Sequence, residues 1–172
     1  DSFDDKSMHI IDPKQSSHWH DIGRQAFRIC DMEDKIEFYQ DYAHTALPEI
    51  LKQGTRIQLA FIDGWHLLDY VMLEAFYCDK MMDPGGLIIL HDMYLKGLQH
   101  FAAFWTTNHN YEAVTLQNGL LTTKPFSSIS GKPFHCTEHF KEHLEPYVSD
   151  SMIVLRKIAE DTRKGMDYTA FV

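Results

Sequence analysis

The chain has 172 residues, of which 44% are hydrophobic and 24% charged, a composition typical of a globular domain with its own core. Its formal net charge of −9 argues against a nucleic-acid partner, because phosphate binding needs clustered lysine and arginine and the basic residues here are scattered. No apolar run approaches the roughly 20 residues that span a bilayer, so no membrane partner is expected. Three widely spaced cysteines favour free thiols and a cytoplasmic location.

Strand-like and helix-like segments alternate from the start of the chain. Met8–Asp12 is a short apolar run that Pro13 stops, which predicts a buried strand. A rough helical stripe of apolar residues follows in His18–Met32. Ile36–Gln40 then predicts a second strand, and Thr45–Lys52 a short helix.

The same alternation continues through the middle of the chain. Arg56–Asp63 predicts a third strand, and Leu67–Met82 has apolar residues at helical spacing. After a turn predicted at Asp83–Gly86, Leu87–His91 is apolar on both faces, as central parallel strands are. Leu95–Trp105 predicts a further helix. This order of elements predicts an α/β fold with a mostly parallel sheet and helices on both faces.

The last part of the chain is less regular. Tyr111–Leu116 and Met152–Lys157 predict two more strands. Between them, Gln117–Asp150 is rich in Gly, Ser, Pro and His, and we expect an irregular insertion with one helix near Thr137–Leu144. Histidines recur in it at intervals of four, at His135, His139 and His143, which on a helix places them along one face that could bind a metal. A solvated helix face is the favoured interpretation, because only Cys136 and Glu142 lie at a matching distance as further ligands.

Polar residues close three of the predicted strands. The first ends at Asp12, the third at Asp63, and the fourth at His91 and Asp92. A single aspartate at a strand end is more often a helix cap or a turn residue. Three of them favour a ligand site, because such sheets bind ligands beyond the carboxyl ends of their strands. Asp12 is suitably placed to accept hydrogen bonds from ribose hydroxyls, although no Gly-x-Gly-x-x-Gly precedes it.

The third and fourth strand ends supply a candidate metal site. Asp63, His91 and Asp92 offer two carboxylates and an imidazole, a set that suits Mg²⁺ or Mn²⁺ and tolerates softer ions. A hydrogen-bonded structural cluster is the equal alternative. His66 follows Asp63 by three residues, and a histidine there can take up a proton near neutral pH. The alternative is a surface histidine in a chain that has 11 of them.

The segment AFIDGWHLLDYVMLEAFYCDKMMDPGGLIILHDM (Ala60–Met93) resembles the second half of class I S-adenosylmethionine-dependent methyltransferases. It is most similar to small-molecule O-methyltransferases of the catechol and macrocin types. Shared features are a strand that ends in Asp, a helix, a Pro-Gly-Gly turn and a strand that ends in a polar pair. The resemblance extends in element order over Met8–Lys157 and implies a Rossmann-like sheet whose last strand, Met152–Lys157, is antiparallel.

The resemblance implies roles for the residues at the strand ends. Asp63 matches the first aspartate that binds the metal, and His91 with Asp92 stands where an Asp-Asn or Asp-Asp pair completes the site. His91 departs from that pattern. His66 falls where catechol-type enzymes carry the lysine that deprotonates the acceptor, so Asp63 and His66 are the implied catalytic residues. The implied contacts to the methyl donor are Asp12, Tyr42, Ala43, His44, Asp63 and Trp65.

One element of the family pattern has no counterpart in this sequence. The family begins with a strand and helix joined by a glycine-rich turn, and that strand would lie between Met8–Asp12 and Arg56–Asp63. Its absence would leave unpaired backbone groups, each costing about 1–3 kcal/mol. We therefore expect residues 1–172 to form a single methyltransferase-like domain that is incomplete at its N-terminal side.

The implied function is transfer of a methyl group from S-adenosylmethionine to a hydroxyl of a small molecule, assisted by Mg²⁺ or another divalent ion. Gln117–Asp150 is then a candidate lid over the acceptor, because such loops supply specificity on a fixed scaffold. The sequence leaves the oligomeric state open, and the resemblance adds a homodimer as one candidate, because similar enzymes are often dimers. One alternative is a metal-dependent hydrolase that uses the same Asp/His cluster. Another is a non-catalytic methyltransferase-like binding module.

Overall fold

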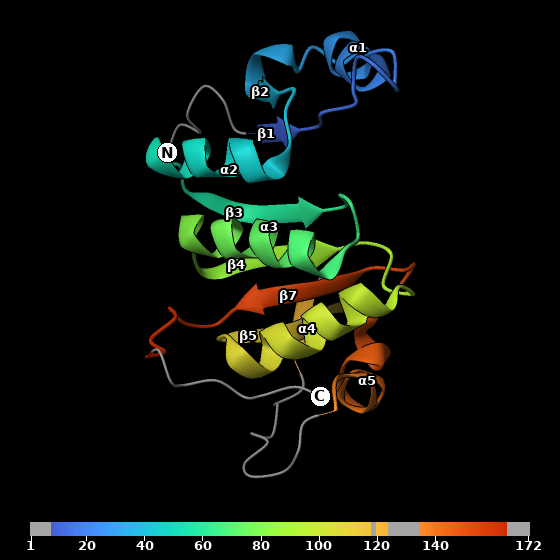
Figure 1. Ribbon diagram of the computed structural model, residues 1–172, viewed down its shortest axis with the longest axis vertical. Helices are drawn as coiled ribbons and strands as arrows, with labels where there is room; N and C mark the ends of the chain where they lie inside the picture. Colours follow the sequence, from blue (N-terminus) through green and yellow to red (C-terminus); the bar gives the residue numbers. More distant parts are fainter. Residues whose placement is uncertain (1–7, 118–119, 124–134, 165–172) are drawn as a thin grey trace. The chain divides into compact units, whose positions relative to one another are not determined.

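The computed structural model describes residues 8–117, 120–123 and 135–164. The chain divides into two compact units, an N-terminal unit (Asp1–Gln53) and a C-terminal unit (Gly54–Val172); Figure 1 identifies their elements by label. The organisation of residues 1–172 as one domain stays a prediction. No helix in the described ranges combines the length and the apolar character that crossing a membrane requires.

The N-terminal unit is built on two parallel strands, β1 (Met8–Ile11) and β2 (Ile36–Tyr39). Between them run the helix α1 and the short 3-10 turn η1, and the helix α2 follows β2; their bounds are Ile22–Ile29, Glu33–Lys35 and Ala43–Lys52. These elements confirm the predicted order. The first helix is shorter than predicted, because His20, Asp21 and Asp31 have left-handed backbone conformations that no helix continues through.

The C-terminal unit contains a five-stranded sheet in the order β3-β4-β7-β5-β6. The bounds of these strands are Ile57–Ile62, Met82–Leu90, Ile153–Lys157, Tyr111–Gln117 and Leu120–Thr123. β3 and β4 are parallel, whereas β7 lies antiparallel between β4 and β5. The α/β class and the antiparallel last strand are therefore confirmed. β6 was not predicted, and it lies in the segment expected to be irregular.

The remaining elements of this unit are helical. They are α3 (Leu68–Met81), α4 (Lys96–Asn108), α5 (Cys136–His139), η2 (Phe140–Leu144) and η3 (Glu145–Tyr147). The helix predicted near Thr137–Leu144 is confirmed, as α5 followed by a π-helical turn. Residues 118–119 and 124–134 of the predicted lid lie outside the described residues, so the lid stays a prediction.

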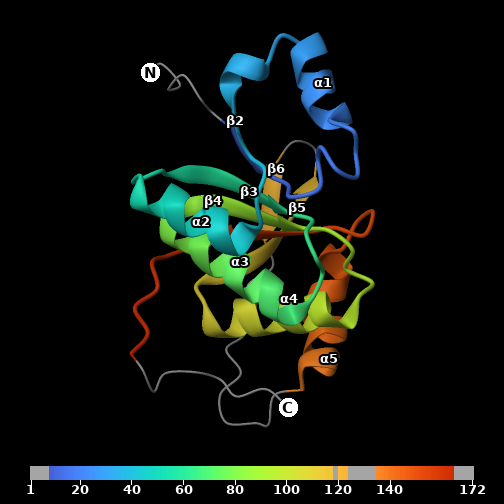
Figure 2. The ribbon, with the colours of Figure 1, turned by 45° about the horizontal axis from the view of Figure 1, so that its top comes forward.

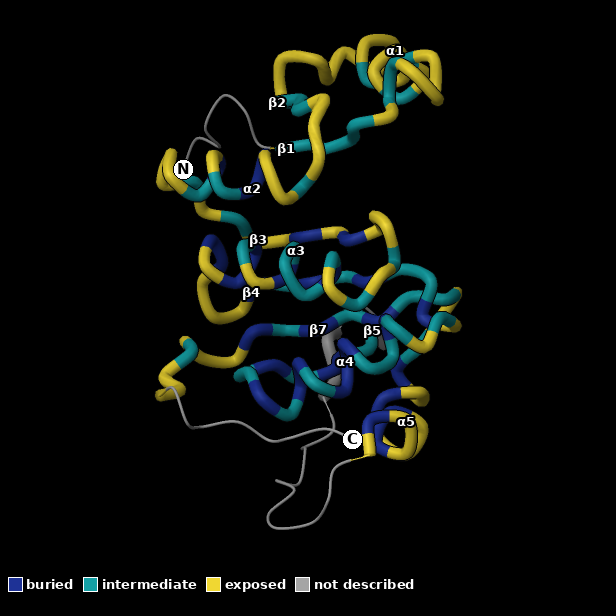
Figure 3. Tube along the Cα trace, in the orientation of Figure 1, coloured by how far each residue is buried: buried dark blue, intermediate teal, exposed yellow. Residues whose placement is uncertain are grey.

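One face of the five-stranded sheet carries the core. The helices α3 and α4 pack together on this face, as Figure 2 shows. The strand residues beneath them are buried: Ala60, Ile62, Ile88, Leu90, Ile153 and Leu155. On the opposite face Leu59 and Phe61 are each 55% exposed, and this alternation along β3 is visible in Figure 3. The strand β3 therefore has one covered face and one open face among the described residues.

The predicted turn at Asp83–Gly86 is wrong, because the structure includes these residues in β4. Ile57 is paired with Met82 and Leu59 with Leu87. Between these two pairs β4 therefore has more residues than β3, as in a large β-bulge. The left-handed φ of +98° at Gly85 explains why this stretch looked like a turn in the sequence.

The strands form two sheets that do not join in the described ranges. β3 pairs with β4 and β1 with β2, and no described strand pairs with the second edge of β3. That the sequence lacks a central strand stays a prediction.

Candidate functional site

Four polar side chains converge beyond the carboxyl ends of β3 and β4. Asp63 follows β3 directly, His66 lies in the loop that leads to α3, and His91 and Asp92 follow β4. The strands bring these residues together because parallel strands end at the same edge of a sheet. The backbone N–H of His91 donates to the carbonyl of Ile62 at 3.2 Å, which holds the two strand ends in register.

The four side chains alternate around a shared space. Nδ1 of His91 lies 2.9 Å from Oδ1 of Asp63 and 3.2 Å from Oδ1 of Asp92. Nε2 of His66 lies 3.3 Å from Oδ1 of Asp63 and 3.2 Å from Oδ2 of Asp92. One potential ligand atom from each residue lies within 4.8 Å of all the others. We call these four residues the rim cluster.

The local backbone is shaped to bring these side chains together. His66 and Asp92 both have left-handed conformations, with φ of +55° and +57°. Such values are uncommon outside glycine and cluster at functional sites. At Gly97, near the start of α4, an added Cβ would lie 3.4 Å from the carbonyl oxygen of His66. This is an ordinary van der Waals distance, so the start of α4 lies directly beside the loop that carries His66.

A third carboxyl group, which the sequence analysis missed, lies beside the rim cluster. Glu74 on α3 places Oε1 3.0 Å from where a Cβ at Gly64 would be, so its side chain fills the space that this glycine leaves. Burial raises the pKa of Glu74 to about 7, because desolvation disfavours the charged form. Its position on the inner side of α3 at helical spacing from Val71 and Cys78 was the available signal.

The predicted donor-binding residues of the N-terminal unit follow the carboxyl ends of β1 and β2. Asp12 follows β1, and its backbone N–H donates to the carbonyl of Tyr39 at 3.0 Å. Its two carboxylate oxygens accept hydrogen bonds from the backbone of Lys14 at 2.8 Å and the side chain of Gln15 at 2.9 Å. Each oxygen keeps a second lone pair for a ribose hydroxyl, so Asp12 fits both a turn role and a ligand role.

Three other predicted donor contacts, Tyr42, His44 and Trp65, carry rings and lie at or just before the start of a helix. In the N-terminal unit, Tyr42 precedes α2, and its ring stacks on that of His44 with centroids 5.4 Å apart; Ala43 lies between them. In the C-terminal unit, Trp65 is 54% exposed and stacks on Tyr70 at 5.7 Å. Flat, accessible rings of this kind are suited to contact a purine or a sulfonium group.

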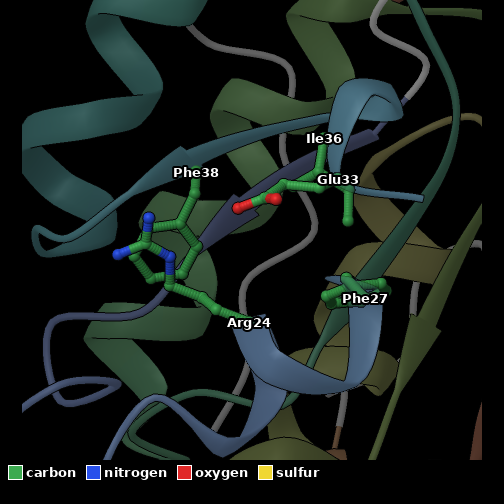
Figure 4. A pocket seen from close by; sticks show the side chains of 5 residues that line it. All are labelled: Arg24, Phe27, Glu33, Ile36 and Phe38. Atoms are coloured by element: carbon green, nitrogen blue, oxygen red, sulfur yellow. The ribbon is translucent and has the colours of Figure 1, made fainter. Parts of the chain in front are cut away.

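The N-terminal unit also contains a pocket. Its lining residues are Arg24, Phe27, Glu33, Ile36 and Phe38. The guanidinium of Arg24 lies over the Phe38 ring, 5.1 Å from its centroid, as Figure 4 shows. This is a cation–π contact between α1 and β2, and the pocket contains none of the predicted site residues.

The histidines of the predicted insertion do not form a solvated face. His139 is only 4% exposed, whereas His135 and His143 are exposed. Burial, and then the nearby His143, lower the pKa of His139 to about 4. The prediction was wrong for His139 because α5 packs against α4, a contact that a local pattern of histidines does not reveal.

The fold and the rim cluster are those of a Rossmann-like α/β protein, in which polar residues lie beyond the carboxyl ends of the parallel strands. A family model described as a methyltransferase domain matches residues 2–93, more than half of the chain. The chain therefore belongs to this family of methyltransferase domains. None of the curated proteins matches it.

Solved structures of two methyltransferases share the fold. The O-methyltransferase TomG from Streptomyces achromogenes, in complex with SAM, has a TM-score of 0.55 at 9% identity, over 90% of this chain and 74% of that one. An O-methyltransferase from Bacillus cereus, in complex with SAH, has a TM-score of 0.54 at 14% identity, over 87% of this chain and 73% of that one. At such identities the likeness establishes the fold alone.

Proposed function

We propose that this protein transfers a methyl group from S-adenosylmethionine to a hydroxyl of a small molecule. The observation that carries the proposal is the rim cluster, which stands at the strand ends of a chain that belongs to a methyltransferase family. SAM and SAH, with which the two similar O-methyltransferases are in complex, support the same cofactor. The net charge of −9 fits a neutral or cationic acceptor better than a polyanion.

The donor supplies an electrophilic methyl group on a sulfonium, and orientation of the acceptor oxygen does most of the catalytic work. We propose that the adenosine part of the donor is bound by Asp12, Tyr42, Ala43 and His44. The end that carries the methyl group would be contacted by Asp63 and Trp65. Trp65 offers the exposed aromatic face that attracts a sulfonium cation.

We propose that the acceptor hydroxyl binds at the rim cluster. A divalent cation held there by Asp63, His91 and Asp92 would lower the pKa of a bound hydroxyl. Four potential ligand atoms within 4.8 Å of one another fit such an ion. The sequence predicts that His66 takes up the released proton; this stays a prediction, and it requires that Nε2 of His66 bind no ion. The cytoplasmic location and the homodimer also stay predictions.

Calorimetric titration of the complete protein with S-adenosylmethionine tests the proposal. We expect saturable binding that Asp12→Asn weakens by about 10–100-fold, because hydrogen bonds to a charged group contribute about 1.5–3 kcal/mol. The matched control is Asp34→Asn, an exposed aspartate on η1, which should leave binding unchanged. No donor binding, or an equal loss in the control, would reject methyl transfer. Turnover of phosphate or ester substrates without any donor would favour a hydrolase instead.

A further inference from the structure

Half of the potential ligand atoms in the rim cluster are imidazole nitrogens. The sequence predicts three ligands, Asp63, His91 and Asp92, of the kind that suits Mg²⁺. The structure adds Nε2 of His66, which lies 3.3 Å from Asp63 and 3.2 Å from Asp92. The set therefore contains two imidazole nitrogens and two carboxylates, whereas Mg²⁺ sites are built from oxygen ligands.

The spacing of these atoms fits a single ion. Two atoms that each lie about 2.1 Å from an ion are about 3.0 Å apart at a right angle and about 3.4 Å apart at a tetrahedral angle. The nitrogen–oxygen separations around the cluster run from 2.9 to 3.3 Å, close to that interval. Asp92 offers a different oxygen to each histidine, and one ligand atom from each residue lies within 4.8 Å of the other three, so a single ion would draw the four side chains slightly together.

Hydrogen bonds alone leave the arrangement incomplete. Each imidazole nitrogen carries at most one proton, yet each faces an oxygen of Asp63 and an oxygen of Asp92. Two protons are then shared among four short contacts, and two carboxylates compete for them. A divalent cation accepts lone pairs from all four groups and offsets both negative charges.

We propose that Asp63, His66, His91 and Asp92 form a four-ligand site for a divalent transition ion of the Zn²⁺ or Co²⁺ type, in preference to Mg²⁺. Imidazole suits zinc, iron, nickel and copper, whereas Mg²⁺ takes oxygen ligands and keeps several waters. A nitrogen bound to an ion has no lone pair for a proton, so His66 is a ligand and not the general base. This inference adds the class of ion to the site of the proposed function. Any role of the ion in catalysis rests on that proposed function.

Nuclear magnetic resonance of the complete protein labelled with ¹⁵N-histidine tests the ligand set directly, with Zn²⁺ added alone and no methyl donor. Of the 11 histidines, we expect the ring signals of two to shift together on addition of Zn²⁺. One of these signals should be lost in His66→Asn and the other in His91→Asp. Asn is suited to position 66, because it tolerates left-handed backbone better than most residues.

Competition against a chromophoric chelator tests the preference between ions. His91→Asp exchanges a nitrogen for an oxygen, and we expect the ratio of Zn²⁺ to Mg²⁺ affinity to fall at least about 10-fold. The matched control is His20→Asn: His20 is exposed and has φ of +50°, close to the +55° of His66. This control should leave both affinities unchanged.

Several results would overturn the proposal: Zn²⁺ binding that moves neither ring signal, an equal loss in His20→Asn, or Mg²⁺ displacing Zn²⁺ at equal concentration. Circular dichroism of the ion-free variants shows whether each one folds, and Asp63→Asn serves as a second ligand variant if His91→Asp does not. These experiments contain no methyl donor, so a negative result would reject the ion site and not methyl transfer. A negative donor titration would likewise reject methyl transfer and not the ion site.

Discussion

The C-terminal unit has polar clusters at both ends of its sheet, and they are built differently. At the end opposite the rim, Lys157 is 1% exposed and donates to the carbonyls of Asp79 at 3.0 Å and Met82 at 2.7 Å. Its Nζ also lies 3.2 Å from the carboxylate of Asp79, which accepts a hydrogen bond from Tyr111 at 3.0 Å. Burial, and then the charge of Asp79, raise the pKa of Tyr111, so its hydroxyl stays a donor. This buried cluster supplies its own cation.

The rim cluster contains no lysine or arginine. Among the described residues, Asp63 and Asp92 have histidines as their ion-pair partners, and their side chains are 44% and 17% exposed. Under our proposal, these two carboxylates and two imidazoles bind a cation from outside. We therefore expect the buried cluster to contribute to stability, and the more exposed rim cluster to contribute less.

The largest expected effect comes from removing the cation of the buried cluster. Lys157→Met leaves the carboxylate of Asp79 buried without its charge partner, and we expect the free energy of unfolding to fall by about 3–5 kcal/mol. Urea denaturation measures it. The control is Lys52→Met, whose ion pair with Glu49 is exposed, with an expected change below about 1 kcal/mol. A loss of similar size in both variants would remove the distinction between buried and exposed pairs.

A smaller effect is expected from Glu74, the neutralised carboxyl beside the rim cluster. Its pKa is raised from 4.5 to about 7, so the folded protein binds a proton that the unfolded chain has released. This contribution to stability is therefore present below about pH 4.5 and is lost as the pH rises towards about 7. Glu74→Gln cannot ionise, and its unfolding free energy should lack this decline. Denaturation of both proteins from about pH 5 to about pH 8 measures the difference; parallel curves would contradict the assigned protonation.

The smallest effect is expected for Asp63→Asn without metal. The asparagine keeps a carbonyl acceptor for His91 and removes one of two neighbouring negative charges, so the free energy of unfolding should change by less than about 0.5 kcal/mol. Addition of Zn²⁺ then separates the two proteins. Zn²⁺ at about 100 times its dissociation constant should stabilise the unsubstituted protein by about 2.7 kcal/mol and the variant by much less. A large ion-free loss would show that the rim cluster is structural after all.

Much of the fold could be predicted from the sequence, because its signals are local. Short apolar runs gave the positions of β1, β2, β3 and β7 to within a residue or two, and the aspartates that close β1 and β3 identified the strand ends. Helical spacing likewise predicted α3 and α4. The errors fell where tertiary contacts dominate: β6 depends on pairing with β5, and the stretch before Leu87 belongs to β4 only through its pairing with β3.

The candidate site divides in the same way. Residue types and their positions after strands were enough to select Asp63, His66, His91 and Asp92 from the sequence. Their mutual distances, and so the place of His66 among the ligand atoms, depend on the left-handed backbone at His66 and Asp92 and on the pairing of β3 with β4. The raised pKa of Glu74 depends on burial beneath the loop. The sequence by itself determined which groups stand at the strand ends, because strand periodicity and chain breakers are local. Only the tertiary structure decided that two imidazoles and two carboxylates share one space, because distances between side chains on separate strands and loops are set by packing.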